Sequence, residues 1–485
     1  MCLGEKLRNQ EVVIFAVSCC HKFIIPKLFT TPVACSLVLI WAQIDCYAVQ
    51  LFSASSVRIW TWLEYLYVVV LLGLLTQGPV LKILEASGQV DSNIIDVTKF
   101  ATYLVVQIPA LMLLSHRGIP SSLLKGPVGV LLVFCSWMLL STVWATFSSY
   151  TLIESVSLFV TCLAGLYIAR SFTLFQQLSL FLVAMQPGLI VSWFAIHNNW
   201  SLSVLSENGA WIGIYFNRNS LAPPAALGLL AALALLRIVV TRRLNWLFAL
   251  LLFVVSVLDA ALLFRSESST SLGAIIVFGI VWIFWTTACS LERQKKLTPK
   301  QKLQIVYPSF LLGIILFTWM GVHYQNFLLR ITGASLGFNG RELLWRYSWI
   351  GFKDRPLLGW GWMSAWHSPN FFVYVQHQGW IPSTESNWSH SAIMDVLVGG
   401  GIVGGSLLVL AIVWSGARQV GRDDTQMVGQ WVLAATWFVI TASTQESFIT
   451  GNHFMWLLLV ALIAGYRDET NINFRKTIVP ATTES

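Results

Sequence analysis

Residues 391–414 read SAIMDVLVGGGIVGGSLLVLAIVW, an apolar run whose one charged residue is Asp395. An α-helix needs about 20 consecutive apolar residues to cross the hydrocarbon core of a bilayer. Similar runs recur along the chain, near residues 32–52, 60–77, 100–115, 124–147, 151–169, 173–196, 220–240, 245–264, 270–289, 304–322, 428–445 and 452–466. A further run at 11–29 is either a span or an interfacial segment. We therefore predict an all-α integral membrane protein with about 12–14 transmembrane helices.

The composition of the 485-residue chain supports this prediction. Hydrophobic residues make up 56% and charged residues 11%, whereas soluble proteins carry roughly 25% charged residues. The net charge is +8, but the basic residues fall in short clusters between apolar runs, as the positive-inside rule produces, so we expect no nucleic-acid partner. The eight cysteines include no CxxC pair and are expected to be small buried residues, neither disulfides nor metal ligands.

The basic clusters also predict an orientation. Cytoplasmic loops are expected at 237–243, 291–302, 418–422 and 467–476. The loops between them then share the opposite, external face, and these are 197–219, 265–269, 323–390 and 446–451. The prediction brings four side chains of interest to that face: Arg218, Arg265, Arg341 and His390.

The long external loop contains a predicted short amphipathic helix. Asn339-Gly340 is a turn pair before the helix, and Pro356 ends it. Between them Trp345, Trp349 and Phe352 recur at helical spacing, with cationic residues around the rest. Such a helix is either a simple interfacial anchor or a support that aims Arg341 at an anion. A guanidinium suits a phosphate because it stays charged and donates two parallel hydrogen bonds.

His390 precedes the glycine-rich span at 391–414. A lone histidine at a helix mouth is more often a cap than a catalyst, but Arg218 and Arg265 flank neighbouring spans on the same predicted face. The glycines have a structural explanation, because small residues four positions apart (Gly400 with Gly404, Gly401 with Gly405) let helices approach closely. Arg218 is either functional or a charged flank that reaches outward. Arg265 is either functional or neutralised by Glu267.

The same loop is rich in aromatic residues. Some are explained by the aromatic belt of a membrane interface, and together they also suit stacking against sugar rings. They are Trp360, Trp362, Trp366, Phe371, Phe372, Tyr374, Trp380 and Trp388. The chain has no P-loop, HExxH, GxSxG or dinucleotide motif. Its histidines lack the spacing of metal ligands, so we expect no metal and no cofactor.

Four segments resemble the O-antigen ligase and polysaccharide polymerase superfamily, which are polytopic glycosyltransferases of bacterial envelopes. Two are specific: His390-Ser391 followed after nine residues by Gly401-Ile-Val-Gly404, and Gly340-Arg341-Glu-Leu-Leu-Trp345 followed by Pro356-Leu-Leu-Gly359-Trp-Gly361. Two are looser, Asn217-Arg218-Asn219-Ser-Leu-Ala222 and Ser268-Ser-Thr-Ser-Leu272. The second of these lacks the basic residue that the family often has there. The resemblance covers roughly residues 205–415.

The resemblance implies transfer of a glycan from a polyprenyl-diphosphate carrier to an acceptor hydroxyl without a metal, and a fold similar to other membrane-embedded glycosyltransferases of the GT-C type. His390 and Arg341 would then be catalytic. The glycan and diphosphate would contact Arg218, Arg265, Asn219, Trp345 and Trp362. Expected partners are the carrier-linked glycan, a glycan or lipid acceptor, the bilayer and other envelope-polysaccharide assembly proteins. The expected location is the inner (plasma) membrane, with the active face periplasmic or extracellular.

We divide the chain accordingly into a transmembrane scaffold (1–204), a ligase/polymerase-like region that includes the long loop 323–390 (205–415), C-terminal transmembrane helices (416–466) and a cytoplasmic tail (467–485). Ligase and polymerase are not separable by these motifs. A different class also stays open, a multi-pass transporter for bicarbonate or another anion. A transporter should carry ionisable residues at mid-membrane depth, and the candidates are Asp45, Glu64, Asp259 and Asp395. A third possibility is a non-catalytic assembly subunit, in which Arg341 and His390 would be dispensable.

Overall fold

The computed structural model describes residues 55–78, 97–119, 121–200, 204–205, 209–294, 298, 301, 304, 341–371, 373, 388–420 and 426–465. The predicted spans at 32–52 and 304–322, the run at 11–29, most of the long external loop and the tail after residue 467 lie outside these residues. The chain divides into two units, residues 1–65 and 66–485, and the second contains every described residue from 66 onward.

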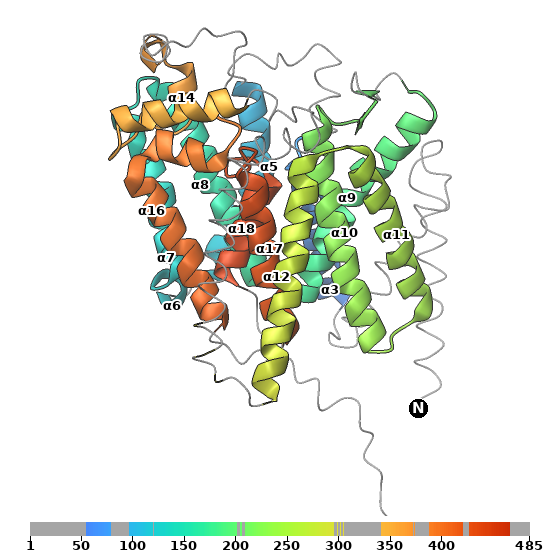
Figure 1. Cartoon of the computed structure of the whole chain (residues 1–485). Helices are drawn as coiled ribbons and strands as arrows, with labels where there is room; N and C mark the ends of the chain where they lie inside the picture. The colour runs from blue at the N-terminus through green and yellow to red at the C-terminus, as the bar shows by residue number, and fades with distance from the viewer. Residues whose placement is uncertain are drawn as a thin grey trace, which may run out of the picture. The chain divides into compact units, whose positions relative to one another are not determined.

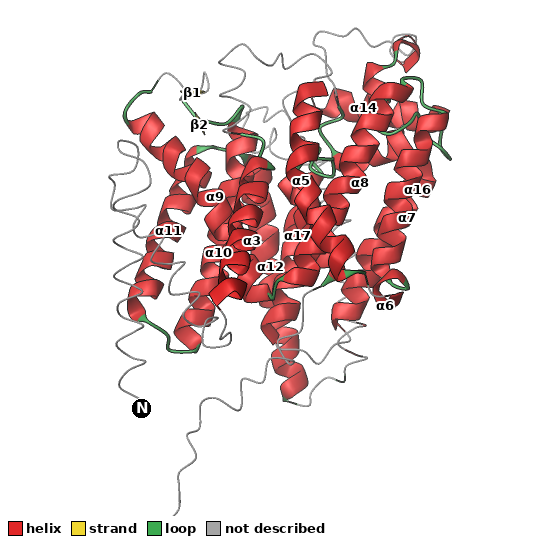
Figure 2. Cartoon of the chain, turned by 180° about the vertical axis from the view of Figure 1, so that it is seen from behind, coloured by secondary structure: helices red, strands yellow, loops and turns green. Residues whose placement is uncertain are grey.

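Helices make up nearly all of the described secondary structure (Figure 2). The α-helices are α3 (Ser55–Leu74), α5 (Val97–Arg117), α6 (Ser121–Leu124), α7 (Pro127–Leu140), α8 (Ser148–Ser171), α9 (Leu174–His197), α10 (Arg218–Thr241), α11 (Trp246–Arg265), α12 (Ser269–Arg293), α14 (Arg341–Asp354), α16 (Ala392–Val420), α17 (Gln426–Ser443) and α18 (Phe454–Ala464). Two short 3₁₀ helices, η1 (Ser141–Val143) and η2 (Ala365–His367), accompany them. Strands β1 (Val204–Leu205) and β2 (Trp211–Gly213) form a small antiparallel pair before α10.

The described helices agree with the predicted spans. Six are long and apolar enough to cross a membrane: Ser148–Ser171, Leu174–His197, Arg218–Thr241, Trp246–Arg265, Ser269–Glu292 and Ala392–Gln419. Four shorter apolar helices add to them, Ile59–Leu74, Pro127–Val143, Met427–Ser443 and Phe454–Ala464. The prediction of an all-α, multi-pass membrane protein is confirmed at this level. The total of 12–14 spans stays a prediction, because two of the predicted spans lie outside the described residues.

The helices pack as neighbours in groups. Helix α10 packs against both α9 and α11, α12 packs along α17, and α16 packs against α7 (Figure 1). Helix α18 is surrounded by α7, α8, α16 and α17, and its residues from Phe454 to Ile463 are all buried. A helix that is apolar on every side belongs in such an interior position. The amphipathic α14 is different: it contacts α16 and runs across the direction of the spanning helices at one end of them (Figure 1).

A kink in α16 joins two of the motifs. Gly401 has φ 64° and ψ −166°, which interrupts the helix. The segment 356–361 fills the interruption, because Trp360 N–H donates to Val398 O (2.8 Å), Gly361 N–H donates to Gly399 O (3.0 Å), and Ile402 N–H donates to Pro356 O (2.8 Å). The Pro-x-x-Gly-x-Gly motif and the glycine-rich span are therefore one structural unit.

The other glycines of α16 explain its close packing on α7. A Cβ atom added at Gly400 or Gly404 would lie 2.4 Å or 2.7 Å from Cε of Met138. Trp137 of α7 also donates from its indole nitrogen to Gly400 O at 2.9 Å. The prediction that small residues let helices approach therefore holds for Gly400 and Gly404. Gly401 instead adopts the non-helical backbone angles that form the kink.

Candidate functional site

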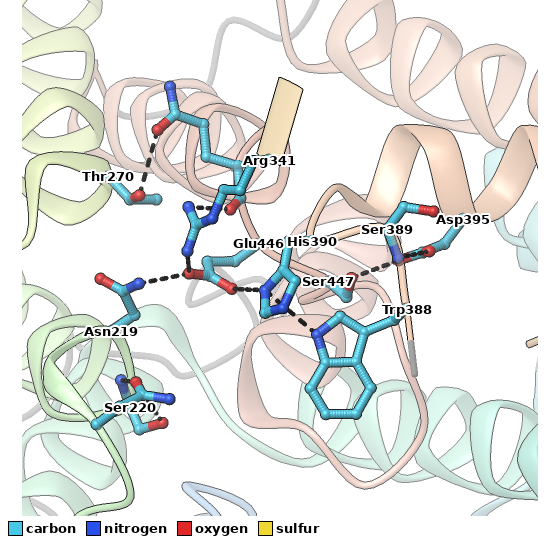
Figure 3. Close-up of polar contacts among 12 residues, drawn as sticks. Asn219, Ser220, Thr270, Arg341, Trp388, Ser389, His390, Asp395, Glu446 and Ser447 are labelled. Atoms are coloured by element: carbon cyan, nitrogen blue, oxygen red, sulfur yellow. Dashed lines mark hydrogen bonds and ion pairs between the residues drawn. The ribbon is translucent and has the colours of Figure 1, made fainter. Parts of the chain in front are cut away.

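Arg341 and Glu446 form the centre of a polar cluster at one end of the helices (Figure 3). Arg341 is the first residue of α14, and Glu446 lies in the short loop between α17 and α18. Nη2 of Arg341 pairs with Oε1 of Glu446, and Nη1 donates to the carbonyl of Gln445 at 2.6 Å. The two side chains are only 12% and 10% exposed. An ion pair this enclosed is weakly screened by solvent and holds both groups in a defined geometry.

His390 reaches the other oxygen of the same carboxylate. Its Nδ1 lies 3.3 Å from Oε2 of Glu446, and the side chain remains one-third exposed. The indole nitrogen of Trp388 also lies 3.3 Å from Nδ1. The cluster therefore combines a fixed cation, an anion and an accessible imidazole.

The backbone at His390 is held in a left-handed conformation, with φ 49°. Such angles are uncommon for residues other than glycine and need support from their surroundings. Asp395 supplies it from the first turns of α16: its Oδ1 accepts the Ser389 N–H at 2.9 Å, and its Oδ2 accepts the Ser447 hydroxyl. Ala392 N–H also donates to the Glu446 carbonyl at 3.2 Å. These hydrogen bonds connect the N-terminal end of α16 to the loop that carries Glu446.

The two looser motifs end at the same place. Asn219, in the first turn of α10, donates from Nδ2 to Oε1 of Glu446 at 2.7 Å. Ser268, at the start of α12, donates its hydroxyl to Oδ1 of Asn219 at 2.9 Å. Thr270 donates to the side-chain oxygen of Gln445 at 3.4 Å. Residues from all four motif segments therefore meet around one acidic side chain.

The remaining predicted arginines lie outside these contacts. Arg218 begins α10 and is partly exposed, and it has no hydrogen bond or ion pair with the described residues. Arg265 ends α11, is exposed, and stacks its guanidinium on the ring of Trp211 at 5.0 Å from the centroid. No ion pair joins Arg265 to Glu267 among the described residues. The structure therefore explains Arg265 by a cation–π contact with the hairpin.

The predicted tryptophans have different environments. Trp345 is partly buried on α14. Trp362 is fully buried, its backbone N–H donates to Ser141 Oγ at 2.9 Å, and it packs against Gly399. In this structure Trp362 is thus part of the interior that supports the kink.

Most of the described aromatic residues of the loop are also interior. Trp360, Trp366 and Phe371 are buried together with Tyr347 of α14 and Val398 of α16. The indole nitrogen of Trp360 donates to Gly351 O at 2.9 Å, and that of Trp366 donates to Ser389 Oγ at 3.1 Å. These rings attach α14 to α16 instead of forming an open stacking surface, while Trp388 is exposed. Phe372, Tyr374 and Trp380 lie outside the described residues.

Within the described ranges, no group of three or more His, Cys, Asp or Glu side chains is arranged to hold a metal ion. The charged groups of the cluster are instead Arg341, Glu446 and, when protonated, His390. A guanidinium such as that of Arg341 can bind an anion, and an imidazole such as that of His390 can exchange a proton.

Glu446 was missed by the sequence analysis. It lies in the predicted external loop 446–451, between two apolar runs, opposite several cations assigned to the same face. An acidic residue in so short a polar loop is a reasonable counter-ion for a nearby arginine, and this signal could have indicated it. The sequence could not indicate which arginine it would meet.

A scan against models of protein families finds no match to this chain, and a search of curated proteins finds none either. The fold itself defines a multi-pass α-helical membrane protein that carries a polar cluster at one end of its helices.

Proposed function

We propose that this protein is a membrane glycosyltransferase that moves a glycan from a polyprenyl-diphosphate carrier to an acceptor hydroxyl in cell-surface polysaccharide synthesis. The observation that carries the proposal is the convergence of Asn219, Ser268, Arg341 and His390 around Glu446. These residues come from the four segments that resemble the ligase and polymerase superfamily. A cluster built from distant segments is what a shared site requires.

The chemistry of the cluster suits such a reaction. A diphosphate leaving group carries negative charge that must be stabilised as its bond to the sugar breaks. Arg341 provides a permanent cation for it, and Arg218, at the start of the neighbouring α10, is a second cation without a described partner. His390 is placed to accept the proton of the acceptor hydroxyl. We propose no metal in this reaction.

The proposed step is one direct displacement. The acceptor oxygen forms a bond to the anomeric carbon while the bond from that carbon to the diphosphate oxygen breaks. The bonding electron pair leaves with the diphosphate, and the acceptor proton passes to His390. Inversion at the anomeric carbon follows, because in a single displacement the acceptor oxygen attacks from the side opposite to the departing diphosphate.

The proposed setting is the inner (plasma) membrane, with the cluster on the periplasmic or extracellular face. The carrier lipid would lie in the bilayer and present its diphosphate at the interface. The amphipathic α14, which runs across the ends of the spanning helices (Figure 1), suits that depth because it carries Trp349 and Lys353.

The test uses cells in which the gene is replaced by one encoding His390→Ala. Carrier-linked glycans are extracted and the attached chains are sized. We expect accumulation of single repeat units if the protein is a polymerase, and of long carrier-linked chains if it is a ligase. An unchanged carrier-linked pool, with normal amounts of the variant protein, would contradict the proposal.

One observation favours a second candidate function, a transporter. Asp259, inside α11, is fully buried, and its two carboxylate oxygens lie 3.2 Å and 2.9 Å from the amide nitrogen of Gln186 in α9. Ionisable residues inside a membrane span are costly and often functional. Asp259→Asn separates the two candidates: altered uptake of bicarbonate or another anion with an unchanged glycan pool favours the transporter.

A further inference from the structure

Glu446 contacts more of the site than any single motif residue does. Its Oε1 accepts from Arg341 Nη2 and from Asn219 Nδ2, and its Oε2 faces His390 Nδ1 (Figure 3). The residue is 8% exposed. We infer that Glu446 is a positioning residue: it sets the orientation of the His390 imidazole and determines which of its nitrogens carries the proton. This inference rests on the proposed function, in which His390 accepts the proton of the acceptor hydroxyl.

Nδ1 of His390 has two hydrogen-bonding neighbours. This atom lies 3.3 Å from both the Glu446 carboxylate and the Trp388 indole nitrogen. It can donate to the carboxylate or accept from the indole, but it cannot do both. A carboxylate paired with Arg341 is ionised and can only accept, so an unprotonated Nδ1 would set two acceptors against each other. The favoured tautomer therefore carries its hydrogen on Nδ1 and donates it to Glu446.

Nε2 of His390 is the nitrogen that remains to act as the base. Once Nδ1 holds the hydrogen, Nε2 has a lone pair and can act as a base. Among the described residues Nε2 has no hydrogen-bond partner, and the side chain is one-third exposed. The acceptor hydroxyl can therefore reach the basic nitrogen, and Glu446 stabilises the imidazolium that forms after proton transfer. An acidic residue orients a histidine by the same logic in serine hydrolases.

The Glu446 side chain is itself held in place by its neighbours. Glu446 is held by donors from α10 and α14, and Asn219 is held in turn by Ser268 at the start of α12. The Glu446 backbone carbonyl also accepts from Ala392 N–H, two positions after His390. Because one carboxylate holds both Arg341 and His390, it fixes the diphosphate cation relative to the base. Positioning at this level determines rates when two groups must act together.

The experiment uses the full-length protein, purified and reconstituted in lipid nanodiscs. The donor is the carrier-linked glycan that accumulates in a strain lacking the gene. Transfer is measured as the decrease in the amount of glycan still attached to the carrier. The variants are Glu446→Gln, Glu446→Asp, His390→Ala and the double variant Glu446→Gln/His390→Ala. Glu267→Gln is the matched control, because Glu267 is an exposed acid beside the start of α12 and contacts none of these residues.

We expect Glu446→Gln to lower kcat by about 10²-fold to 10⁴-fold, the usual contribution of a positioned acid or base. An amide can donate to Nδ1, which would move the hydrogen to Nε2 and remove the base. Glu446→Asp should recover part of the activity, because it keeps the charge at a shorter reach. The loss in the double variant should be smaller than the product of the two single losses, since Glu446 acts in part through His390. Glu267→Gln should match the wild type.

A second measurement uses the wild-type protein, so it does not depend on whether the variants fold. The ¹⁵N chemical shifts of the His390 side chain in the wild-type protein report which nitrogen carries the hydrogen. We expect the Nδ1–H form, with Glu446→Asp retaining it. Detection of the Nε2–H form in the wild type would overturn the inference.

The outcomes separate the inference from the proposed function. A wild-type protein that transfers no glycan overturns the proposed function. A wild type that transfers glycan, a His390→Ala variant that does not, and a Glu446→Gln variant with unchanged kcat overturn only the role of Glu446. Losses that multiply in the double variant would also overturn it, because they would make the two residues independent.

Discussion

The Nδ1 atom of His390 lies 3.3 Å from the Oε2 atom of Glu446, although the two residues are 56 positions apart in the sequence. The other oxygen of this carboxylate is paired with Arg341, which belongs to a third segment of the chain. The contact therefore depends on the mutual placement of α14, α16 and the loop between α17 and α18. Substitutions that disturb that placement should affect the site even when they lie outside it.

Arg341→Ala should destabilise the protein and abolish transfer. The substitution leaves Glu446 enclosed without its ion pair, and losing one partner of a buried pair typically costs about 3–5 kcal/mol. Arg341→Lys should fold better but still accumulate carrier-linked glycan, since an ammonium cannot reproduce the two contacts of the guanidinium. Thermal unfolding in detergent and the size of the carrier-linked pool measure the two effects.

Arg346→Ala is the control for this prediction, because Arg346 is an exposed residue of the same helix. Its unfolding midpoint should stay close to that of the wild type, because the free energy of unfolding should change by about 0.5 kcal/mol or less. Equal effects of the substitutions at 341 and 346 would contradict a specific role for Arg341.

Asp395→Asn should loosen the mouth of α16 and lower transfer. Both carboxylate oxygens accept hydrogen bonds, from Ser389 N–H and from the Ser447 hydroxyl. An amide would turn one acceptor into a donor that faces a donor, at a cost of about 1–3 kcal/mol for a buried group. Ser447→Ala removes only one of the bonds and should cost about 0.5–1.5 kcal/mol. A glycan pool and unfolding midpoint unchanged in Asp395→Asn would show that this carboxylate does not support His390.

Gly401→Ala should be strongly destabilising. The φ of 64° is unfavourable for a residue with a Cβ atom, at about 1–2 kcal/mol. The added Cβ would also lie 2.1 Å from the carbonyl oxygen of Leu357, so the segment 356–361 would have to move. The unfolding midpoint of the detergent-solubilised protein measures the effect.

Gly273→Ala is the matched control for Gly401→Ala. Gly273 lies inside α12, where an added Cβ meets no atom within 4 Å. In a helix interior the substitution should stabilise by about 0.5–1 kcal/mol. Similar midpoints for the two variants would argue against the kink as a structural requirement.

His453 should make stability depend on pH. Its Nδ1 accepts the Met455 N–H at 3.1 Å at the start of α18, and its ring stacks on Phe448 and Phe454 at 5.0 Å and 4.9 Å between centroids. Part of its surface remains accessible, but the stacked rings surround the imidazole, and burial lowers the pKa of His453 from 6.5 to about 3. The folded protein therefore keeps it neutral, while the unfolded chain takes up a proton below 6.5.

The contribution of neutral His453 to the free energy of unfolding is present above pH 6.5 and is lost as the pH falls from 6.5 towards 3. His453→Asn keeps a capping acceptor but cannot titrate. The difference in unfolding midpoint between the wild type and this variant should therefore shift in favour of the variant as the pH falls through that window. A constant difference across the window would contradict the prediction.

Local features of the chain were predictable from the sequence. The apolar runs at 151–169, 173–196 and 220–240 correspond to α8, α9 and α10, because the length and polarity of a run decide whether it can form a membrane-spanning helix. Helix α14 was equally predictable, since Asn339-Gly340 and Pro356 bracket a helical pattern. The positive-inside rule also brought Arg341 and His390 to the same end, where they both contact Glu446.

Contacts between distant segments were decided only by the tertiary structure. The sequence treats Arg218, Arg265 and Arg341 alike, as cations beside spans, yet only Arg341 is paired with Glu446, whereas Arg265 stacks on Trp211. Trp362 is one of the aromatic residues that the sequence suggested for stacking against sugar rings, but it is buried next to Gly399. Hydrophobic pattern is a local property that specifies helices and their ends. Which side chains meet depends on how those helices pack, and a kink at a single residue such as Gly401 changes that packing.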